Sequence, residues 1–193
     1  INYSRSRDEA EQTAAELNAL GVKGIAVQAD MAEESACRQM VERAVSEFGR
    51  LDVLVNNAGI QHVANVEDFP PERWDAVIAL NLSSAFHTTR LAMPTMKARN
   101  WGRILNIASV HGLVASAQKS AYVAAKHGII GLTKTVALET ATTPVTCNAI
   151  CPGWVLTPLV QKQVDAKAQA MGLSNEEAKK VLLGDRKSTR LNS

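Results

Sequence analysis

The stretch SVHGLVASAQKSAYVAAK, residues 109–126, organises the rest of the chain. Tyr122 and Lys126 are four residues apart, and on a helix this spacing places both side chains on one face, one turn apart. A free tyrosine has a pKa of about 10, and an ammonium group beside it favours the phenolate and lowers that pKa. The spacing therefore predicts a tyrosine that works as a general acid or base at neutral pH.

Ser109 directly follows the apolar run Ile104–Ala108, which is typical of a strand. A hydroxyl at the carboxyl end of a strand lies where open α/β sheets bind their ligands. A Tyr-x-x-x-Lys match is weak alone, because a helix with a packed tyrosine and a solvated lysine gives the same pattern. The serine at a strand end and the motifs described below favour the catalytic interpretation.

Strand and helix patterns alternate along the whole chain. Apolar runs predict strands at 24–28, 51–55, 103–108 and 145–151, after a strand that ends at Tyr3. Ser6 with Glu9, and Asp30 with Glu33, are typical of capping boxes that open two helices. Further helices are expected from Pro70-Pro71 to about Pro94, from about 119 to 140, and near 157–171 and 174–183. This alternation predicts one α/β domain whose parallel sheet is covered on both faces.

Composition excludes several classes of partner. The 193 residues carry a net charge of +2 without long charged runs, which indicates neither nucleic acid nor a membrane surface. The apolar runs are too short to span a bilayer. The three cysteines and four histidines lack metal-ligand spacing, so we expect no metal site. We expect Cys37, Cys147 and Cys151 to be reduced thiols in a cytoplasmic protein.

These motifs together resemble the short-chain dehydrogenase/reductase family. The residues that carry the resemblance are Asn56-Asn57-Ala58-Gly59, Asn81, Ser109, Tyr122, Lys126 and Pro152-Gly153. The resemblance runs from Ile1 to about Gly184 and implies a Rossmann-like doubly wound parallel sheet. Within the family it is strongest to members that oxidise D-3-hydroxybutyrate to acetoacetate, through residues 59–62, 109–112, 119–128 and 148–155.

The resemblance implies a role for each catalytic residue. Tyr122 would take the hydroxyl proton while a hydride passes to a nicotinamide cofactor, and Lys126 would assist it and bind the cofactor ribose. Ser109 would hold the substrate oxygen. Asn81 would position a water molecule, although a helix residue that only binds backbone is the plainer interpretation.

The resemblance also implies the binding residues. For the cofactor these are Asp30, Asn57, Ala58, Gly59, Tyr122, Lys126, Pro152, Gly153, Val155 and Thr157. An ordinary turn at Asn57–Gly59 and a plain helix cap at Asp30 are the alternatives. A short hydroxy acid needs donors for its carboxylate. Those donors would be Gln61, His111, Lys119 and Gln163, with Ser109 and Tyr122 at the reacting oxygen and Trp154 as a wall; solvated loop residues are the alternative.

The choice of cofactor and substrate is less sharply indicated. An acidic residue after the second strand binds the ribose of NAD, whereas an arginine accommodates the phosphate of NADP. This chain has Arg5 there, which favours NADP, while the resemblance implies NAD; we expect NAD, with NADP as the alternative. Another small alcohol, ketone or 3-oxoacyl substrate is the alternative reaction, and a catalytically silent nucleotide-binding protein is the alternative outside enzymes.

Both ends of the chain look incomplete against the family pattern. The glycine-rich turn G-x-x-x-G-x-G is absent from the sequence, and residues 185–193 resemble a translated sequencing adapter. We therefore expect a single incomplete dinucleotide-binding domain over residues 1–184, truncated at both ends. The resemblance implies a homotetramer for the full-length protein, and we expect the chain by itself to be inactive.

Overall fold

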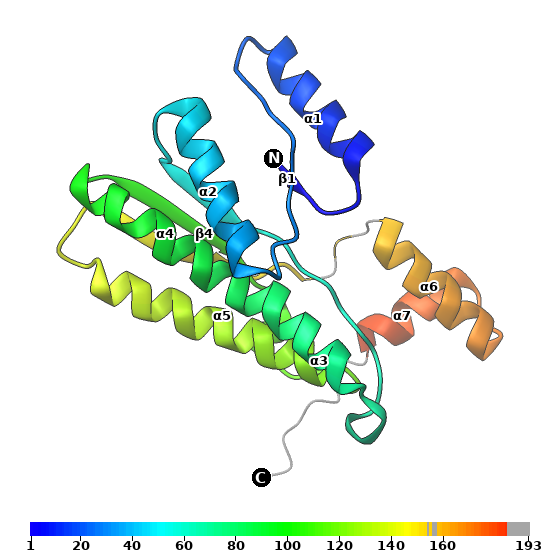
Figure 1. Cartoon of the computed structure of the whole chain (residues 1–193). Helices are drawn as coiled ribbons and strands as arrows, with labels where there is room; N and C mark the ends of the chain where they lie inside the picture. Colours follow the sequence, from blue (N-terminus) through cyan, green and yellow to red (C-terminus); the bar gives the residue numbers. More distant parts are fainter. Residues whose placement is uncertain (154, 156–157, 185–193) are drawn as a thin grey trace.

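The structure, a computed structural model, describes residues 1–153, 155 and 158–184. Parallel strands and helices alternate along these residues, as the sequence predicted (Figure 1). The strands are β1 (Asn2–Tyr3), β2 (Val27–Gln28), β3 (Val53–Asn56), β4 (Gly102–Ile107) and β5 (Val145–Ile150). The helices are α1 (Arg7–Ala19), α2 (Glu34–Phe48), α3 (Pro71–Ile78), α4 (Ser84–Ala98), α5 (Ser120–Glu139), α6 (Pro158–Met171) and α7 (Asn175–Gly184).

Short helical turns complete the connections. The 3₁₀ turns η1 (Val66–Asp68) and η3 (Val110–Gly112) follow β3 and β4 respectively. The π-helix η2 (Ala79–Ser83) lies between α3 and α4, so that residues 71–98 are helical without a break. The long helix predicted from Pro70-Pro71 is therefore confirmed, with Pro94 inside its last turns, but its π segment was not predicted.

The described strands form two parallel sheets rather than the single sheet that the sequence predicted. β1 pairs only with β2, while β3, β4 and β5 pair in that order. The register of the second sheet places Asn56 opposite Asn106 and Ile107 opposite Ile150. The predicted strand at 24–28 is reduced to Val27–Gln28, which pairs with Asn2–Tyr3.

Helices cover one face of the three-stranded sheet. The core on that face joins α4, α5 and the sheet through Ala92, Met96, Ile104, Val136, Val145 and Cys147 (Figure 1). On the opposite face, Val53, Val55 and Ile150 are 46%, 52% and 50% exposed. The described residues thus have the Rossmann-like α/β fold that the sequence predicted, in a partial form: this face of the three-stranded sheet is uncovered by them, while α1 contacts β1 of the β1–β2 sheet.

The two predicted capping boxes do not form. Ser6 is the N-cap of α1 but makes no side-chain capping bond. Residues 30–33 form a turn before α2, in which the Asp30 carboxylate accepts a hydrogen bond from the Ala32 amide at 3.1 Å. A reciprocal box that the sequence analysis missed opens α7, where Ser174 and Glu177 each accept from the backbone amide of the other.

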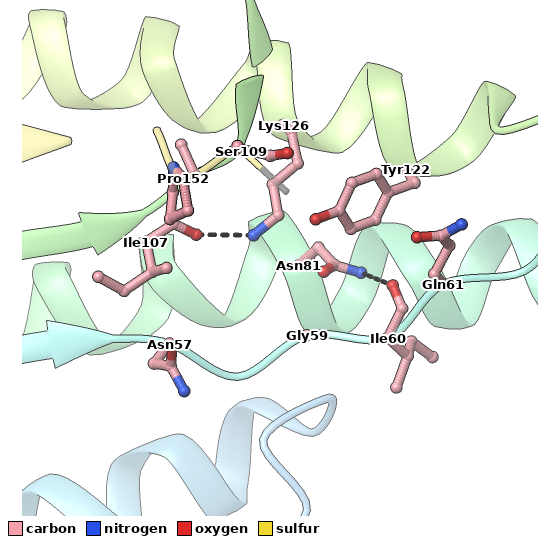
Figure 2. A pocket seen from close by; sticks show the side chains of 12 residues that line it. Asn57, Gly59, Ile60, Gln61, Asn81, Ile107, Ser109, Tyr122, Lys126 and Pro152 are labelled. Carbon is pink, nitrogen blue, oxygen red and sulfur yellow. Dashed lines mark hydrogen bonds between the residues drawn. The ribbon is translucent and has the colours of Figure 1, made fainter. Parts of the chain in front are cut away.

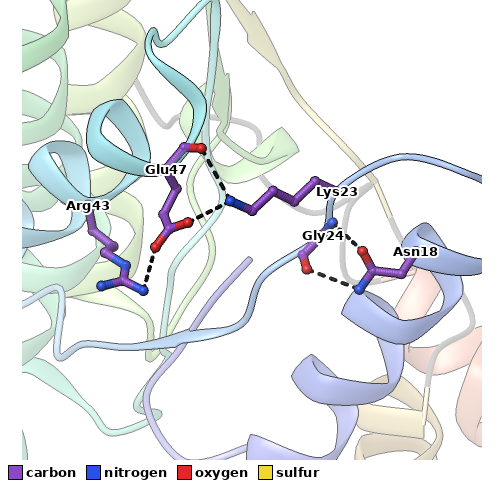
Figure 3. Close-up of polar contacts among 5 residues, drawn as sticks. All are labelled: Asn18, Lys23, Gly24, Arg43 and Glu47. Carbon is purple, nitrogen blue, oxygen red and sulfur yellow. Dashed lines mark hydrogen bonds and ion pairs between the residues drawn. The ribbon is translucent and has the colours of Figure 1, made fainter.

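Polar contacts fasten the β1–α1–β2 unit to α2 (Figure 3). The Glu47 carboxylate on α2 accepts from Lys23 at 2.7 Å and from Arg43 at 2.6 Å. The Asn18 side chain bonds both the N–H and the C=O of Gly24, at 2.9 and 3.2 Å. Solvent-exposed ion pairs contribute little to stability. We therefore interpret these contacts as fixing the position of the loop at 20–24.

A buried polar network crosses the main sheet. The Asn106 side chain, which is 0% exposed, accepts from Asn56 at 2.9 Å and donates to Thr133 at 2.9 Å. The Asn56 Oδ1 atom in turn accepts from the Thr88 hydroxyl at 2.7 Å. The network therefore joins α4, β3, β4 and α5, and it holds the ends of β3 and β4 in register.

None of the described helices has the length and apolar character of a membrane-spanning segment.

We expect Asn106→Ala to lower the free energy of unfolding by about 2–4 kcal/mol, because it removes the hydrogen bonds to Asn56 and Thr133 and leaves a cavity at a fully buried position. Urea denaturation measures this loss. Asn148→Ala is the matched control, since Asn148 lies on β5 with an exposed side chain, and it should change stability by less than about 0.5 kcal/mol. Equal losses in the two variants would contradict the structural role of the network.

Candidate active site

A cavity of about 310 Å³ opens at the carboxyl ends of β3, β4 and β5 (Figure 2). The chain leaving each strand lines it: Asn57 and Gly59 after β3, Ser109 after β4, and Pro152-Gly153 after β5. The helices supply Asn81, Tyr122 and Lys126, and the loop after β3 also supplies Gln61. This is the edge at which parallel α/β sheets bind ligands.

Tyr122 and Lys126 reach this cavity from the same face of α5, as their spacing predicts. The Lys126 Nζ lies 5.6 Å from the centroid of the Tyr122 ring. It donates a hydrogen bond of 2.7 Å to the carbonyl oxygen of Ile107, the last residue of β4 (Figure 2). Lys126 is only 4% exposed. The lysine is thus a buried cation beside the tyrosine, which excludes the interpretation of a solvated lysine.

The electrostatics of Lys126 follow from this burial. Desolvation penalises the charged ammonium and lowers the pKa of Lys126 to about 8, while the nearby Cys151 acts weakly in the opposite sense. The site therefore holds a cation that can lose its proton only slightly above neutral pH.

Ser109 is held with its hydroxyl at the cavity. It is the N-cap of η3, and its Oγ accepts a hydrogen bond from the His111 amide at 3.1 Å. Because the hydroxyl serves as an acceptor in this bond, its proton can be donated to another group. The His111 ring meets the Tyr122 ring edge-on, with centroids 6.2 Å apart.

Asn81 lies at the centre of the π-helix and is 1% exposed. Its amide nitrogen donates to the carbonyl oxygen of Ile60 at 2.8 Å (Figure 2) and to that of Val77 at 2.9 Å. The side chain thus binds backbone, and its role in holding a water molecule stays a prediction. Its Oδ1 atom is buried without a hydrogen-bond partner among the described residues. A buried acceptor of this kind at a cavity is suited to a ligand or a water molecule.

Gly59 makes room for Asn81. A Cβ at position 59 would lie 2.5 Å from the Asn81 Oδ1, well inside van der Waals contact. Any larger residue would therefore displace either the turn after β3 or the Asn81 side chain. This steric requirement gives Gly59 a role that the sequence analysis did not identify.

The structure brings together only part of the predicted site. Among the predicted residues, those that line the cavity are Asn57, Gly59, Gln61, Asn81, Ser109, Tyr122, Lys126, Pro152 and Gly153. Of the described residues, those that do not line it are Asp30, Ala58, His111, Lys119, Val155 and Gln163. Trp154 and Thr157 lie outside the described residues.

Physical reasons account for several of these positions. Asp30 follows β2 and so belongs to the other sheet, and Lys119 is the N-cap of α5. Gln163 lies on α6, whose buried residues Val164 and Ala168 face α7. The cofactor-binding role of Asp30 and the substrate-binding roles of Lys119 and Gln163 stay predictions. Ile107, which lines the cavity and binds Lys126, was missed, because an apolar strand residue carries no sign of what its carbonyl does.

No group of three or more His, Cys, Asp or Glu side chains among the described residues could hold a metal ion. The three cysteines are free thiols, of which Cys37 and Cys147 are buried.

Known proteins resemble the chain over most of its length. The family described as short chain dehydrogenase matches residues 1–168. D-beta-hydroxybutyrate dehydrogenase of Cupriavidus necator is 70% identical over 155 residues, which is 80% of this chain and 60% of that protein. The protein of the same name from Rhizobium meliloti is 60% identical over 149 residues, 77% of this chain and 58% of its own length.

A more distant relative, a 3-oxoacyl-[acyl-carrier-protein] reductase of Staphylococcus aureus, is 38% identical over 171 residues, which is 89% of this chain and 70% of that protein. The chain spans about three fifths of the length of the two hydroxybutyrate dehydrogenases.

We expect the buried Lys126 to give the stability of the protein a distinct pH dependence. Between about pH 8 and 10.5 the unfolded chain keeps a proton that the folded protein has lost, so stability rises with pH in this window. The penalty of the buried charge is fully present below pH 8. Lys126→Met should abolish the rise, whereas Lys134→Met, on the exposed side of the same helix, should keep it.

The measurement is the free energy of urea unfolding across this window, taken as the difference between the wild type and each variant. The difference is needed because burial raises the pKa of Cys147 to about 11, which lowers stability over part of the same range. A rise of the same size in the wild type and in Lys126→Met would contradict the burial of the lysine.

Proposed function

The chain belongs to the short-chain dehydrogenase family, and we propose that it carries the catalytic centre of an enzyme that oxidises D-3-hydroxybutyrate to acetoacetate with a nicotinamide cofactor. The observation that supports this most is the convergence of Ser109, Tyr122 and the buried Lys126 on one cavity at the sheet edge. The names of the two most similar relatives described above support the substrate.

The residues at the cavity fit a nicotinamide cofactor. Asn57, Gly59 and Gly153 offer backbone at the strand ends, where a dinucleotide crosses a sheet of this kind. The buried Oδ1 of Asn81 and the Nζ of Lys126 supply an acceptor and a donor for bound hydroxyl groups or water. When bound, the cofactor accepts the hydride that leaves the carbinol carbon of the substrate.

The protein residues would move the proton in the same reaction. Ser109 would donate a hydrogen bond to the substrate oxygen, since its Oγ already accepts one from the His111 amide. The Tyr122 phenolate would take the proton of the alcohol and become a neutral phenol as the carbon–oxygen double bond forms. Lys126, held by the Ile107 carbonyl, would place a positive charge beside the tyrosine and stabilise its phenolate before the proton is taken up.

Recognition of the substrate carboxylate is proposed from the polar residues on the open side of the cavity. Gln61 lines the cavity, and the His111 ring lies against Tyr122. Lys119 and Gln163 do not line it in this structure, so their contacts with a substrate would need the neighbouring elements to approach. We keep all four as the proposed carboxylate-binding set, with Trp154 as a wall.

We further propose NAD rather than NADP as the cofactor, and a single domain over residues 1–184. The strong similarity to the hydroxybutyrate dehydrogenases supports NAD, whereas Arg5 after β1 leaves NADP as the alternative. Reduction of a 3-oxoacyl thioester is the second candidate, supported only by the more distant Staphylococcus relative. The homotetramer and the cytoplasmic location stay predictions.

The proposal is tested with an extended protein, in which residues 1–184 are completed at both ends with the corresponding segments of the Cupriavidus relative. We expect it to reduce NAD in the presence of D-3-hydroxybutyrate and to discriminate against neutral secondary alcohols, because the carboxylate needs the polar donors described above. The readout is cofactor absorbance over a panel of hydroxy acids, alcohols and 3-oxoacyl thioesters with NAD and NADP. Equal turnover of a neutral alcohol would overturn the substrate assignment.

Tyr122→Phe should lower kcat of the extended protein by about 100-fold or more, because the ring still packs but the proton carrier is lost. Titration of NADH by fluorescence should give a Kd close to that of the wild type. Retention of more than about a tenth of the wild-type rate would exclude Tyr122 as the general base.

A further inference from the structure

Two loops beside the cavity are far apart in the sequence but are joined to each other by hydrogen bonds. The loop that follows β3 carries Ala64 and Asn65, and the loop before α5 carries Gln118. The Ala64 amide donates to the Gln118 carbonyl oxygen at 3.0 Å, and the Gln118 side-chain amide donates to the Asn65 Oδ1 at 3.1 Å. We name this pair of bonds the loop bridge.

Gln118 adopts an unusual backbone conformation to make the bridge. Its φ is 62°, and among the described residues Asn100 is the other non-glycine residue with a positive φ. The left-handed region is sparsely populated by residues with long side chains and is kept only where the surroundings compensate its cost. The backbone bond to Ala64 and the start of α5 at the next residues are the surroundings that compensate it here.

The bridge lies close in sequence to proposed substrate-binding residues on both loops. Gln61, which lines the cavity, precedes Ala64 by three positions on the same loop. Lys119, the N-cap of α5, immediately follows Gln118, and Tyr122 lies in the first turn of that helix. The bridge therefore fixes the spacing between the loop that carries Gln61 and the end of the helix that carries Tyr122.

We propose that Gln118 is a positioning residue for the substrate side of the site, which it controls through the loop bridge without touching the substrate. This inference rests on the function proposed above. Left-handed backbone at residue 118 directs its carbonyl to Ala64 and sets the direction in which Lys119 leaves the loop. The cofactor side of the cavity, at Asn57, Gly59 and Lys126, belongs to the same two segments but lies further from the bridge in sequence, at the end of β3 and in the second turn of α5. The bridge therefore acts on substrate affinity and leaves cofactor affinity nearly unchanged.

The test compares three variants of the extended protein. Gln118→Val places a β-branched residue at a positive φ, which disfavours the bridge geometry. Gln118→Asn is the conservative control, because asparagine tolerates this conformation and keeps an amide. Asn65→Ala removes only the side-chain bond. We expect Gln118→Val to raise KM for D-3-hydroxybutyrate about tenfold, the factor that corresponds to about 1.4 kcal/mol, with the NADH Kd within about twofold of the wild type.

Hydrogen exchange of the Ala64 amide provides a readout that does not depend on activity. We expect this amide to be protected in the wild type, in Gln118→Asn and in Asn65→Ala, and to exchange about tenfold faster in Gln118→Val. An unprotected Ala64 amide in the wild type would show that the bridge is absent and overturn the inference. Faster exchange in Gln118→Val with an unchanged KM would overturn it as well, because the bridge would then have no effect on the substrate.

Failure of the proposed function gives a different result. If the wild-type extended protein does not turn over D-3-hydroxybutyrate, the proposed reaction falls, and KM is compared for the panel substrate that it uses best. If Gln118→Val does not fold, Gln118→Ala, which disfavours the same conformation less severely, takes its place. A rise in KM that accompanies faster exchange supports the bridge with either variant, whereas equal rises in KM and NADH Kd would indicate general destabilisation and overturn it.

Discussion

The hydrogen bond from the buried Lys126 ammonium to the Ile107 carbonyl is the contact on which the rest of the site depends. A charge that is 4% exposed is costly unless it is hydrogen-bonded, and the end of β4 supplies the acceptor. That acceptor is in place only if β4 is correctly aligned with its neighbours. The Asn56–Asn106 bond, one residue further into the sheet, enforces this alignment and also fixes the turn at Asn57 on the other side of the cavity. The hydrogen bonds inside the sheet therefore also determine the geometry of the site.

The sequence predicted the parts of this arrangement that depend on local spacing and strand order. Four-residue spacing placed Tyr122 and Lys126 on one helical face, and an apolar run placed Ser109 at a strand end. Parallel strands then bring their carboxyl ends to one edge, so the convergence of the residues after β3, β4 and β5 was predictable.

Features that depend on partners distant in the chain were not predictable. The Ile107 carbonyl, the Asn106 network and the bridge at Gln118 each join residues 19 to 54 positions apart, and their residue types do not indicate these partners. The capping pattern at Asp30 and Glu33 failed for a related reason, since the same residues also suit a turn that precedes the helix. The family resemblance implied Lys119 and Gln163 as hydrogen-bond donors to the substrate carboxylate, and these roles stay predictions, since neither residue lines the cavity.

The π-helix at Ala79–Ser83 makes the rotation of α4 depend on one wide turn. A π turn holds one more residue than an α turn, so it accommodates an extra residue without changing the rotational phase of α4 relative to α3. If the same residues closed into regular α-helix, every position beyond them would rotate by about 100° around the helix axis. Thr88, which bonds Asn56 from inside the core, would then turn away from it. Substitutions that close the π turn are therefore expected to disrupt the core, whereas a one-residue deletion that closes it would leave α4 in its present rotation.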